Sequence, residues 1–256
     1  MITGMKKIRS LLFLLLAPML FAGAADLAVA QALMAKKDYP AAIAALEVIV
    51  AASPQDAGAQ LALGNALTAR IGEVGLLSKG GLAKRSLAAY ERAAALDTQN
   101  TDARVALVQF YTQAPFFAGG DRAKAYASAR ELAALDAWRG NFWLMRMHLE
   151  DKEQAEAFKA CDALLRAEPE SYRALYQLGR TVAVTGQQRE RGAAALRRAL
   201  TLTPGADDPK KENAYNRLGQ ILEASGDVAG ARAAYDGALA LDPKLEDAKT
   251  RRAKLK

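Results

Sequence analysis

The sequence contains only one cysteine, Cys161, and only one histidine, His148. A single cysteine cannot form a disulfide within the chain, and these two residues cannot by themselves complete an ordinary zinc site. The serines follow neither the G-x-S-x-G nor the S-x-x-K pattern of nucleophilic enzymes. We therefore expect no enzyme activity and no cofactor, and we interpret Cys161 and His148 as structural residues of the core.

Proline is also scarce, and runs of β-branched residues are nearly absent. The chain has eight prolines among 256 residues, whereas alanine and leucine occur throughout. Alanine and leucine favour helices over strands. With 52% hydrophobic and 25% charged residues, the composition is that of a globular protein. The sequence therefore predicts an all-α globular protein.

The first 24 residues differ from the rest of the chain. Lys6, Lys7 and Arg9 precede an apolar run over 11–21, and small residues follow. This order is typical of a secretory signal peptide. The apolar run is about half of the roughly 20 residues needed to span a bilayer. We therefore expect a cleaved signal peptide over 1–24 and no stable membrane span after its removal.

The net charge of +7 is concentrated at the two ends of the sequence. Removal of the three basic residues of the signal peptide lowers it to +4, and the segment 244–256 has six basic and two acidic residues. The body over 25–243 is therefore neutral. A neutral body lacks the basic surface of a nucleic-acid-binding domain, so we expect no nucleic-acid partner.

A pattern of Leu-Gly, Gly-Asp, small residues, an aromatic residue or leucine, and a final proline recurs along this body. It is clearest in "NAYNRLGQILEASGDVAGARAAYDGALALDP" (213–243) and returns in "SYRALYQLGRTVAVTGQ" (171–187) and "AGAQLALGNAL" (57–67). The pattern resembles the tetratricopeptide repeat (TPR), a helix-turn-helix unit of about 34 residues. The resemblance implies six units, which end at Pro54, Thr98, Ala137, Pro169, Pro204 and Pro243.

The resemblance implies a right-handed superhelical solenoid of about six TPR repeats over 25–243, with 244–256 as a basic capping helix. In the family, small residues let the two helices of a repeat approach closely. Here these residues are Gly64, Gly179 and Gly219 on the first helices. The large side chains expected to fill the space on the second helices are Tyr90, Leu196 and Tyr235.

The register of the first repeat bears on where the signal peptide is cleaved. Two A-x-A sites compete, 22–24 and 28–30. The first helix should run from about Asp26 to Lys36. Cleavage after Ala30 would remove its first turn, so we expect the mature chain to begin at Ala25.

Two repeats carry insertions, at 71–80 and 114–119, in the turn between their first and second helices. Both turns should lie on the same edge of the solenoid. One interpretation is that these apolar loops pack on each other, with both phenylalanines at least partly buried, and this is our expectation. The other is an exposed apolar patch for a partner or a membrane face. The residues concerned are Leu76, Leu77, Phe116 and Phe117.

TPR proteins usually bind an extended peptide or a helix on the concave surface formed by their first helices. Arginine side chains suit carboxylates, and amides can bind an extended backbone. The implied partner is therefore a protein or peptide with an acidic or C-terminal segment. Alternatively, the arginines pair with acidic residues of the next repeat. The family positions that face the groove correspond to Arg139, Phe142, Arg146, Arg173, Tyr176, Arg180, Asn213, Asn216 and Gln220.

Together with the signal peptide, the resemblance implies a non-catalytic scaffold or adaptor in the periplasm of a bacterial envelope. The alternative is an accessory subunit of an envelope enzyme or secretion complex that docks through the apolar loop edge.

Overall fold

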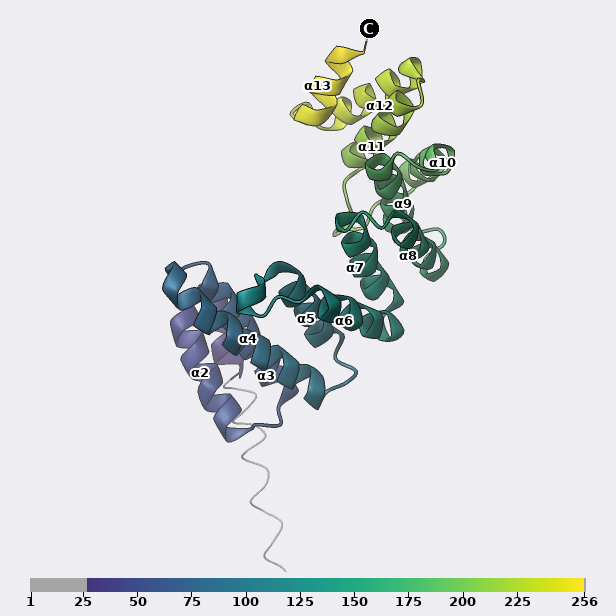
Figure 1. The fold of residues 1–256 in the computed structure, drawn as a ribbon. Coiled ribbons are helices and arrows are strands. Elements are labelled where there is room, and N and C mark those ends of the chain that lie inside the picture. The colour runs from purple at the N-terminus through teal and green to yellow at the C-terminus, as the bar shows by residue number, and fades with distance from the viewer. Residues whose placement is uncertain (1–26, 256) are drawn as a thin grey trace, which may run out of the picture. The chain divides into compact units, whose positions relative to one another are not determined.

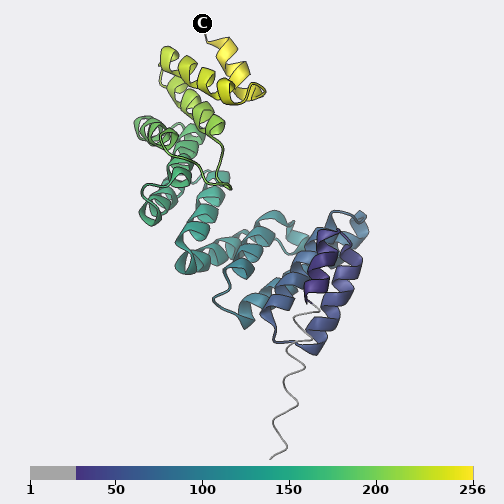
Figure 2. The same cartoon turned by 180° about the vertical axis from the view of Figure 1, so that it is seen from behind.

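The computed structural model describes residues 27–255, which form helices joined by short turns (Figures 1 and 2). The predicted signal peptide and the residue Ala25 lie outside these described residues. Among residues 27–255 there is no strand, so the all-α prediction is confirmed. After a helical segment over 27–35 come α2 (Tyr39–Ala52), α3 (Ala57–Ile71), α4 (Leu76–Leu96), α5 (Thr101–Gln113), the short 3-10 helix η1 (Phe116–Ala118), α6 (Arg122–Leu135), α7 (Ala137–Glu150), α8 (Gln154–Ala167), α9 (Tyr172–Thr185), α10 (Arg189–Leu200), α11 (Lys211–Ala224), α12 (Val228–Leu241) and α13 (Glu246–Lys254).

The chain divides into two compact units, Met1–Ala125 and Tyr126–Lys256, and the division falls within α6. In the N-terminal unit α3 packs against α2 and α4, and these helices lie side by side in both views (Figures 1 and 2). In the C-terminal unit consecutive helices form antiparallel pairs: α7 with α8, α9 with α10, and α11 with α12.

Short polar side chains explain where several helices begin. Asp56 accepts a hydrogen bond from the backbone N–H of Ala59 at 2.9 Å, and Asn100 does the same for Ala103 at 2.9 Å. Asp136 and Asp227 cap α7 and α12 in the same way. Each cap satisfies a backbone donor that has no partner within its helix, which is worth about 1 kcal/mol.

Glycines on the first helices make room for large side chains on the second helices. A Cβ atom added to Gly64 would lie less than 3.0 Å from the ring of Tyr90, and one added to Gly219 would meet Tyr235 equally closely. A Cβ atom added to Gly179 would likewise lie less than 3.0 Å from the Leu196 side chain. The predicted pairing of small and large residues is therefore confirmed.

Gly140 on α7 is a further close-packing glycine, which sequence reasoning missed. A Cβ atom there would collide with the backbone of Ala133 on α6. The residue lies outside the Leu-Gly pattern, so its role follows from the packing of two consecutive helices at a sharp turn rather than from the repeat.

The insertion at 71–80 is not the loop that we expected. Helix α3 continues to Ile71 and α4 already begins at Leu76, so half of the inserted residues lengthen α4 to 21 residues. Gly75 has an extended backbone and separates the two helices. No proline interrupts the following residues, so the helix extends back into the insertion.

The second insertion forms a tight turn that depends on its two glycines. Gly119 has a φ of 105°, in the left-handed region that favours glycine. Gly120 donates a backbone hydrogen bond to the carbonyl of Pro115 at 3.0 Å, and any Cβ there would overlap the Ala114 carbonyl. This turn holds η1 with Ala118 buried.

We predict opposite stability effects for two glycine-to-alanine substitutions within helices. Gly219→Ala should lower the free energy of unfolding by about 1–3 kcal/mol, because its methyl group overpacks against Tyr235. Gly81→Ala on α4 should raise it by about 0.5–1 kcal/mol, because no atom lies within 4 Å and alanine favours the helix. Urea unfolding of both variants measures this, and changes of the same sign would contradict the packing described here.

Candidate partner-binding surfaces

The nine predicted groove residues all lie in the C-terminal unit, on α7, α9 and α11. We call this the first-helix surface. Helix α9 contacts α11, and the Arg173 guanidinium of α9 lies 4.0 Å from the ring centroid of Trp138 on α7. Tyr176 and Asn216 are buried, whereas the other seven are partly exposed. The exposed parts of those seven side chains are what a partner could touch, unless another residue already occupies them.

Two arginines of this surface lie over aromatic rings. Arg146 lies over the Trp143 ring at 4.9 Å and near Phe142 at 5.9 Å. Trp138 stacks with Phe142, so Arg173 and Arg146 border the same aromatic group. Attraction between a cation and a ring face restrains the guanidinium groups.

Arg173 is already paired within the unit. Its Nε donates to Glu168 Oε2 at 2.8 Å, and its Nη2 donates to Glu168 Oε1. These bonds are the main reason why the pKa of Glu168 lies below its usual value. The acid lies just before α9, not on the next repeat as the alternative interpretation required. Arg173 is therefore less available to a partner than its position suggests.

Arg180 differs from Arg173 because it has neither an ion pair nor a hydrogen bond with any residue that the structure describes. Burial lowers the pKa of Arg180, and the nearby charges of Arg217 and Arg146 add to this, while Tyr176 opposes it. Arg146 has one acid, Glu150, at 4.0 Å. Like charges held together in a partly buried place repel, and a bound anion would relieve the repulsion.

Arg217 is a member of this cluster that sequence reasoning missed. It donates from Nη1 to Gln220 Oε1 at 2.9 Å and meets no acid among residues 27–255. It follows the groove residue Asn213 by one helical turn on α11. That spacing was the available signal, but the family pattern does not include it.

Two of the three amides that the last repeat contributes to this surface are occupied by α13. Asn216 Nδ2 and Gln220 Nε2 both donate to Asp247 Oδ2, at 2.8 and 2.6 Å. Arg251 Nε donates to Asp247 Oδ1 at 3.0 Å. Burial raises the pKa of Asp247, but these three hydrogen bonds outweigh it and leave the pKa lowered. A partner could reach these amides only by displacing α13.

Cys161 is a buried core residue, as we expected, whereas His148 is only partly buried. Cys161 is buried with its Sγ 3.2 Å from Thr181 Oγ1, and burial raises the pKa of its thiol to about 11. His148 Nδ1 lies 2.6 Å from Glu153 Oε2, and its ring packs on Tyr126. Within the described range, no group of three or more acidic, cysteine or histidine residues is placed to hold a metal ion.

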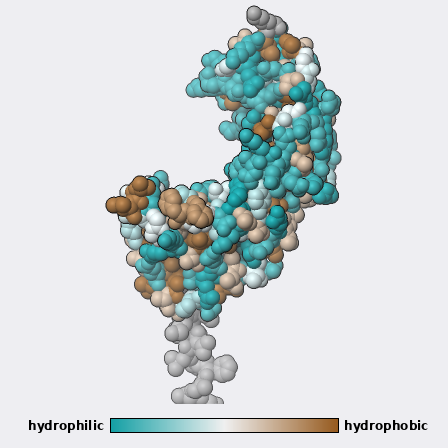
Figure 3. Space-filling view, in the orientation of Figure 1, coloured by the Kyte–Doolittle hydropathy of each residue, from teal (hydrophilic) through white to brown (hydrophobic). Residues whose placement is uncertain are grey.

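The N-terminal unit exposes a group of large apolar side chains, which we call the apolar rim. It was expected to be partly buried, and that expectation is wrong. The turn that buries Ala118 directs its two phenylalanine neighbours outward, and α4 begins with two leucines on its first turn. Figure 3 shows hydrophobic residues protruding from this unit. The exposed fractions are 81% for Leu76, 101% for Leu77, 91% for Phe116 and 76% for Phe117.

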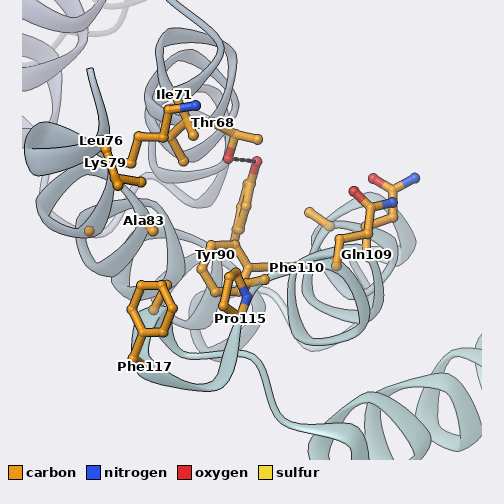
Figure 4. Close-up of a pocket in the computed structure, with 15 residues that line it drawn as sticks. Thr68, Ile71, Leu76, Lys79, Ala83, Tyr90, Gln109, Phe110, Pro115 and Phe117 are labelled. Atoms are coloured by element: carbon orange, nitrogen blue, oxygen red, sulfur yellow. Dashed lines mark hydrogen bonds between the residues drawn. The ribbon is translucent and has the colours of Figure 1, made fainter. Parts of the chain in front are cut away.

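A cavity of about 310 Å³ opens beside this rim, between α3, α4, α5 and the turn at 114–118 (Figure 4). Tyr90 and Phe110 form part of its wall, with their rings edge to face at 6.4 Å. The Tyr90 hydroxyl lies 3.0 Å from Thr68 Oγ1 and donates to Asn65 Oδ1 at 3.0 Å. The cavity is therefore mainly apolar, and the polar tip of its tyrosine is already satisfied.

Comparison with known proteins supports the repeat interpretation. Two family models, both described as tetratricopeptide repeat, match residues 11–57 and 212–245. No curated protein matches the sequence significantly. Together with the helix pairs described above, these matches show that the chain carries TPR repeats.

Solved TPR structures share the fold. PilW, a widely conserved type IV pilus biogenesis factor, is 15% identical, with a TM-score of 0.63 over 90% of this chain and 97% of its own. PilF of Pseudomonas aeruginosa is 14% identical, with a TM-score of 0.61 over 91% and 97%. YrrB, a TPR protein with an unusual peptide-binding site, is 15% identical, with a TM-score of 0.55 over 81% and 97%. The predicted TPR solenoid fold is thus confirmed. No helix within residues 27–255 is both long enough and apolar enough to cross a membrane.

We predict that Phe116→Ser and Phe117→Ser leave the free energy of unfolding within about 0.5 kcal/mol of the parent protein, because both side chains are exposed. Phe110→Ala is the matched control, since Phe110 is buried and its truncation should cost about 3–5 kcal/mol. Thermal or urea unfolding tests this. A loss of several kcal/mol in either serine variant would mean that the turn packs inward in solution.

Proposed function

We propose that this TPR protein is a non-catalytic scaffold whose first-helix surface binds an acidic or C-terminal peptide segment of a partner protein. TPR repeats generally serve as protein–protein interaction scaffolds, and the fold here is theirs. One observation carries the finer proposal: Arg180 is a partly buried cation without an acidic partner among residues 27–255, and Arg146 and Arg217 stand near it.

The surroundings of Arg180 suit a carboxylate better than a neutral group. Three guanidinium groups from α7, α9 and α11 present several donors in fixed directions, and arginine binds carboxylates through paired hydrogen bonds. Asp247 gives an internal example on the same surface, because its carboxylate accepts from two amides and an arginine. We propose that a partner's carboxylate binds one repeat earlier, at Arg180.

We predict that Arg180→Gln weakens the binding of an aspartate-rich peptide at least about tenfold, the loss expected for one charge-assisted hydrogen bond. The probe is a fluorescent synthetic peptide with a run of aspartates and a free C-terminus, measured by anisotropy. Added salt should also weaken binding to the parent protein, because screening reduces the attraction between exposed charges.

The matched control is Arg198→Gln on α10, where Arg198 pairs with Glu170 on an exposed surface. This variant removes the same charge elsewhere in the unit and should leave binding unchanged. A control peptide with asparagine in place of each aspartate should bind weakly to the parent protein and to both variants. Equal affinity of the parent protein and Arg180→Gln for the aspartate peptide would refute the proposed site.

We also propose that the scaffold works in the periplasm of a bacterial envelope. The basic, apolar and small-residue order of residues 1–24 supports this location. PilW, a structural neighbour, is a pilus biogenesis factor. An envelope assembly is thus the setting that we favour for this chain.

We predict that the protein, expressed with its full sequence in a Gram-negative host, is recovered from the periplasm with the mass of a chain that begins at Ala25. Ala30 is buried in the core with α2 and α3, so a chain that begins at Gln31 would lose part of that core. Intact-mass measurement after osmotic shock distinguishes the two starts. Retention of the uncleaved chain in the cytoplasm would exclude the periplasmic proposal.

A further inference from the structure

The cavity of the N-terminal unit has the form of a receptor for a convex apolar group. Its volume of about 310 Å³ is at the lower end of the range of about 300–1,000 Å³ for ligand sites. Leu76 and Phe117 line it and also belong to the apolar rim (Figure 4). A hollow and protruding apolar side chains therefore form one continuous surface.

The apolar rim is unusual for a surface that faces only water. Its four side chains are the most exposed large apolar residues that the structure describes. Leu77 and Phe116 expose almost their whole side chains. Contiguous exposed apolar side chains mark interaction sites, whereas single ones are ordinary.

The polar groups beside the cavity specify the charge of the ligand. Lys79 lines the cavity and has no hydrogen bond or ion pair with the described residues. Gln109 and Gln113 lie one helical turn apart on α5, line the cavity and are exposed. No acidic residue lines the cavity. A cation and two amides beside an apolar hollow favour an apolar group that carries a nearby carboxylate.

These features discriminate between three occupants. In a symmetric pair joined through this cavity, both copies would bring a lysine and neither lining would bring an acid to pair with it. A bilayer surface would receive the protruding side chains but would not present a convex group to the hollow. An amphipathic helix supplies apolar side chains at i, i+3 and i+4 together with acidic residues one turn away.

We infer that this cavity is a docking site for an acidic amphipathic helix of a partner protein. One large apolar side chain of the helix enters the hollow, and a carboxylate of the helix meets Lys79. The site lies in the N-terminal unit and is independent of the peptide site proposed for Arg180.

The test uses the mature chain and two synthetic amphipathic peptides with leucine at the i, i+3, i+4 and i+7 positions. One peptide has glutamate on its polar face and the other has lysine. Isothermal titration should show binding of the glutamate peptide only. Lys79→Glu should weaken that binding at least about tenfold and should allow the lysine peptide to bind.

Three variants make the test specific. Lys84→Glu introduces the same charge reversal five positions along α4, outside the cavity, and should have little effect. Phe117→Ser should weaken the glutamate peptide without changing the melting temperature, because the side chain is exposed. Arg180→Gln should leave this binding unchanged, so a failure of the peptide site and a failure of this one are distinguishable.

Several results would overturn the inference. These are equal binding of both peptides, binding of neither, or equal effects of Lys79→Glu and Lys84→Glu. Binding to phosphatidylglycerol vesicles that Phe117→Ser abolishes, with no peptide binding, would assign the surface to a membrane. A dimer in sedimentation equilibrium that Phe117→Ser dissociates would assign it to a second copy.

Discussion

The contact between a glycine of one helix and a large side chain of the next is the constraint on which the rest of this structure depends. At Gly64 and Gly219 a tyrosine ring lies where any Cβ atom would collide with it. Each ring fills the space between its two helices, and its hydroxyl is hydrogen-bonded: Tyr90 to Asn65 and Tyr235 to Glu223. One tyrosine side chain thus fills the apolar space with its ring and also gives its buried hydroxyl a hydrogen-bond partner.

This packing also determines what the first helices present. The stacking of α9 against its neighbours brings Arg180 close to Arg146 and Arg217, although the three charges repel. The helices are held by buried contacts such as those of Leu178 and Ile221, which do not depend on the arginines. The core can therefore hold a cation without an acidic partner, and a partly buried charge of that kind is a feature of binding surfaces.

Sequence reasoning succeeded where structure depends on local spacing. The Leu-Gly pattern located Gly64, Gly179 and Gly219 because each directly follows a leucine at the same place in its first helix. It failed at the insertions, where the direction of a side chain depends on one turn. Whether Phe116 faces inward or outward is decided by the conformation of Gly119 and Gly120, which no pattern of apolar residues reveals.

The candidate surfaces could also be predicted only in part, because local spacing identifies helix positions but not their partners. The family positions pointed to Arg180, which lies on a partly exposed helix face, but they did not show which arginines already had partners. Glu168 neutralises Arg173 from a turn, and Asp247 occupies the amides of Asn216 and Gln220 from another helix. Such partners come from outside the repeat pattern, so only the three-dimensional structure identifies them.

Helix α13 caps the C-terminal end of the repeat array. It packs on α11 and α12 and buries Ala248, while its charged residues face outward or pair with acids such as Asp236. Stacked repeats otherwise leave an apolar helix face at their last unit, onto which another stack can add. Because α13 covers α12 in this way, the apolar side of α12 is not open to a further repeat stacked on it. A partner of the C-terminal unit therefore meets the faces of its helices rather than a bare apolar end.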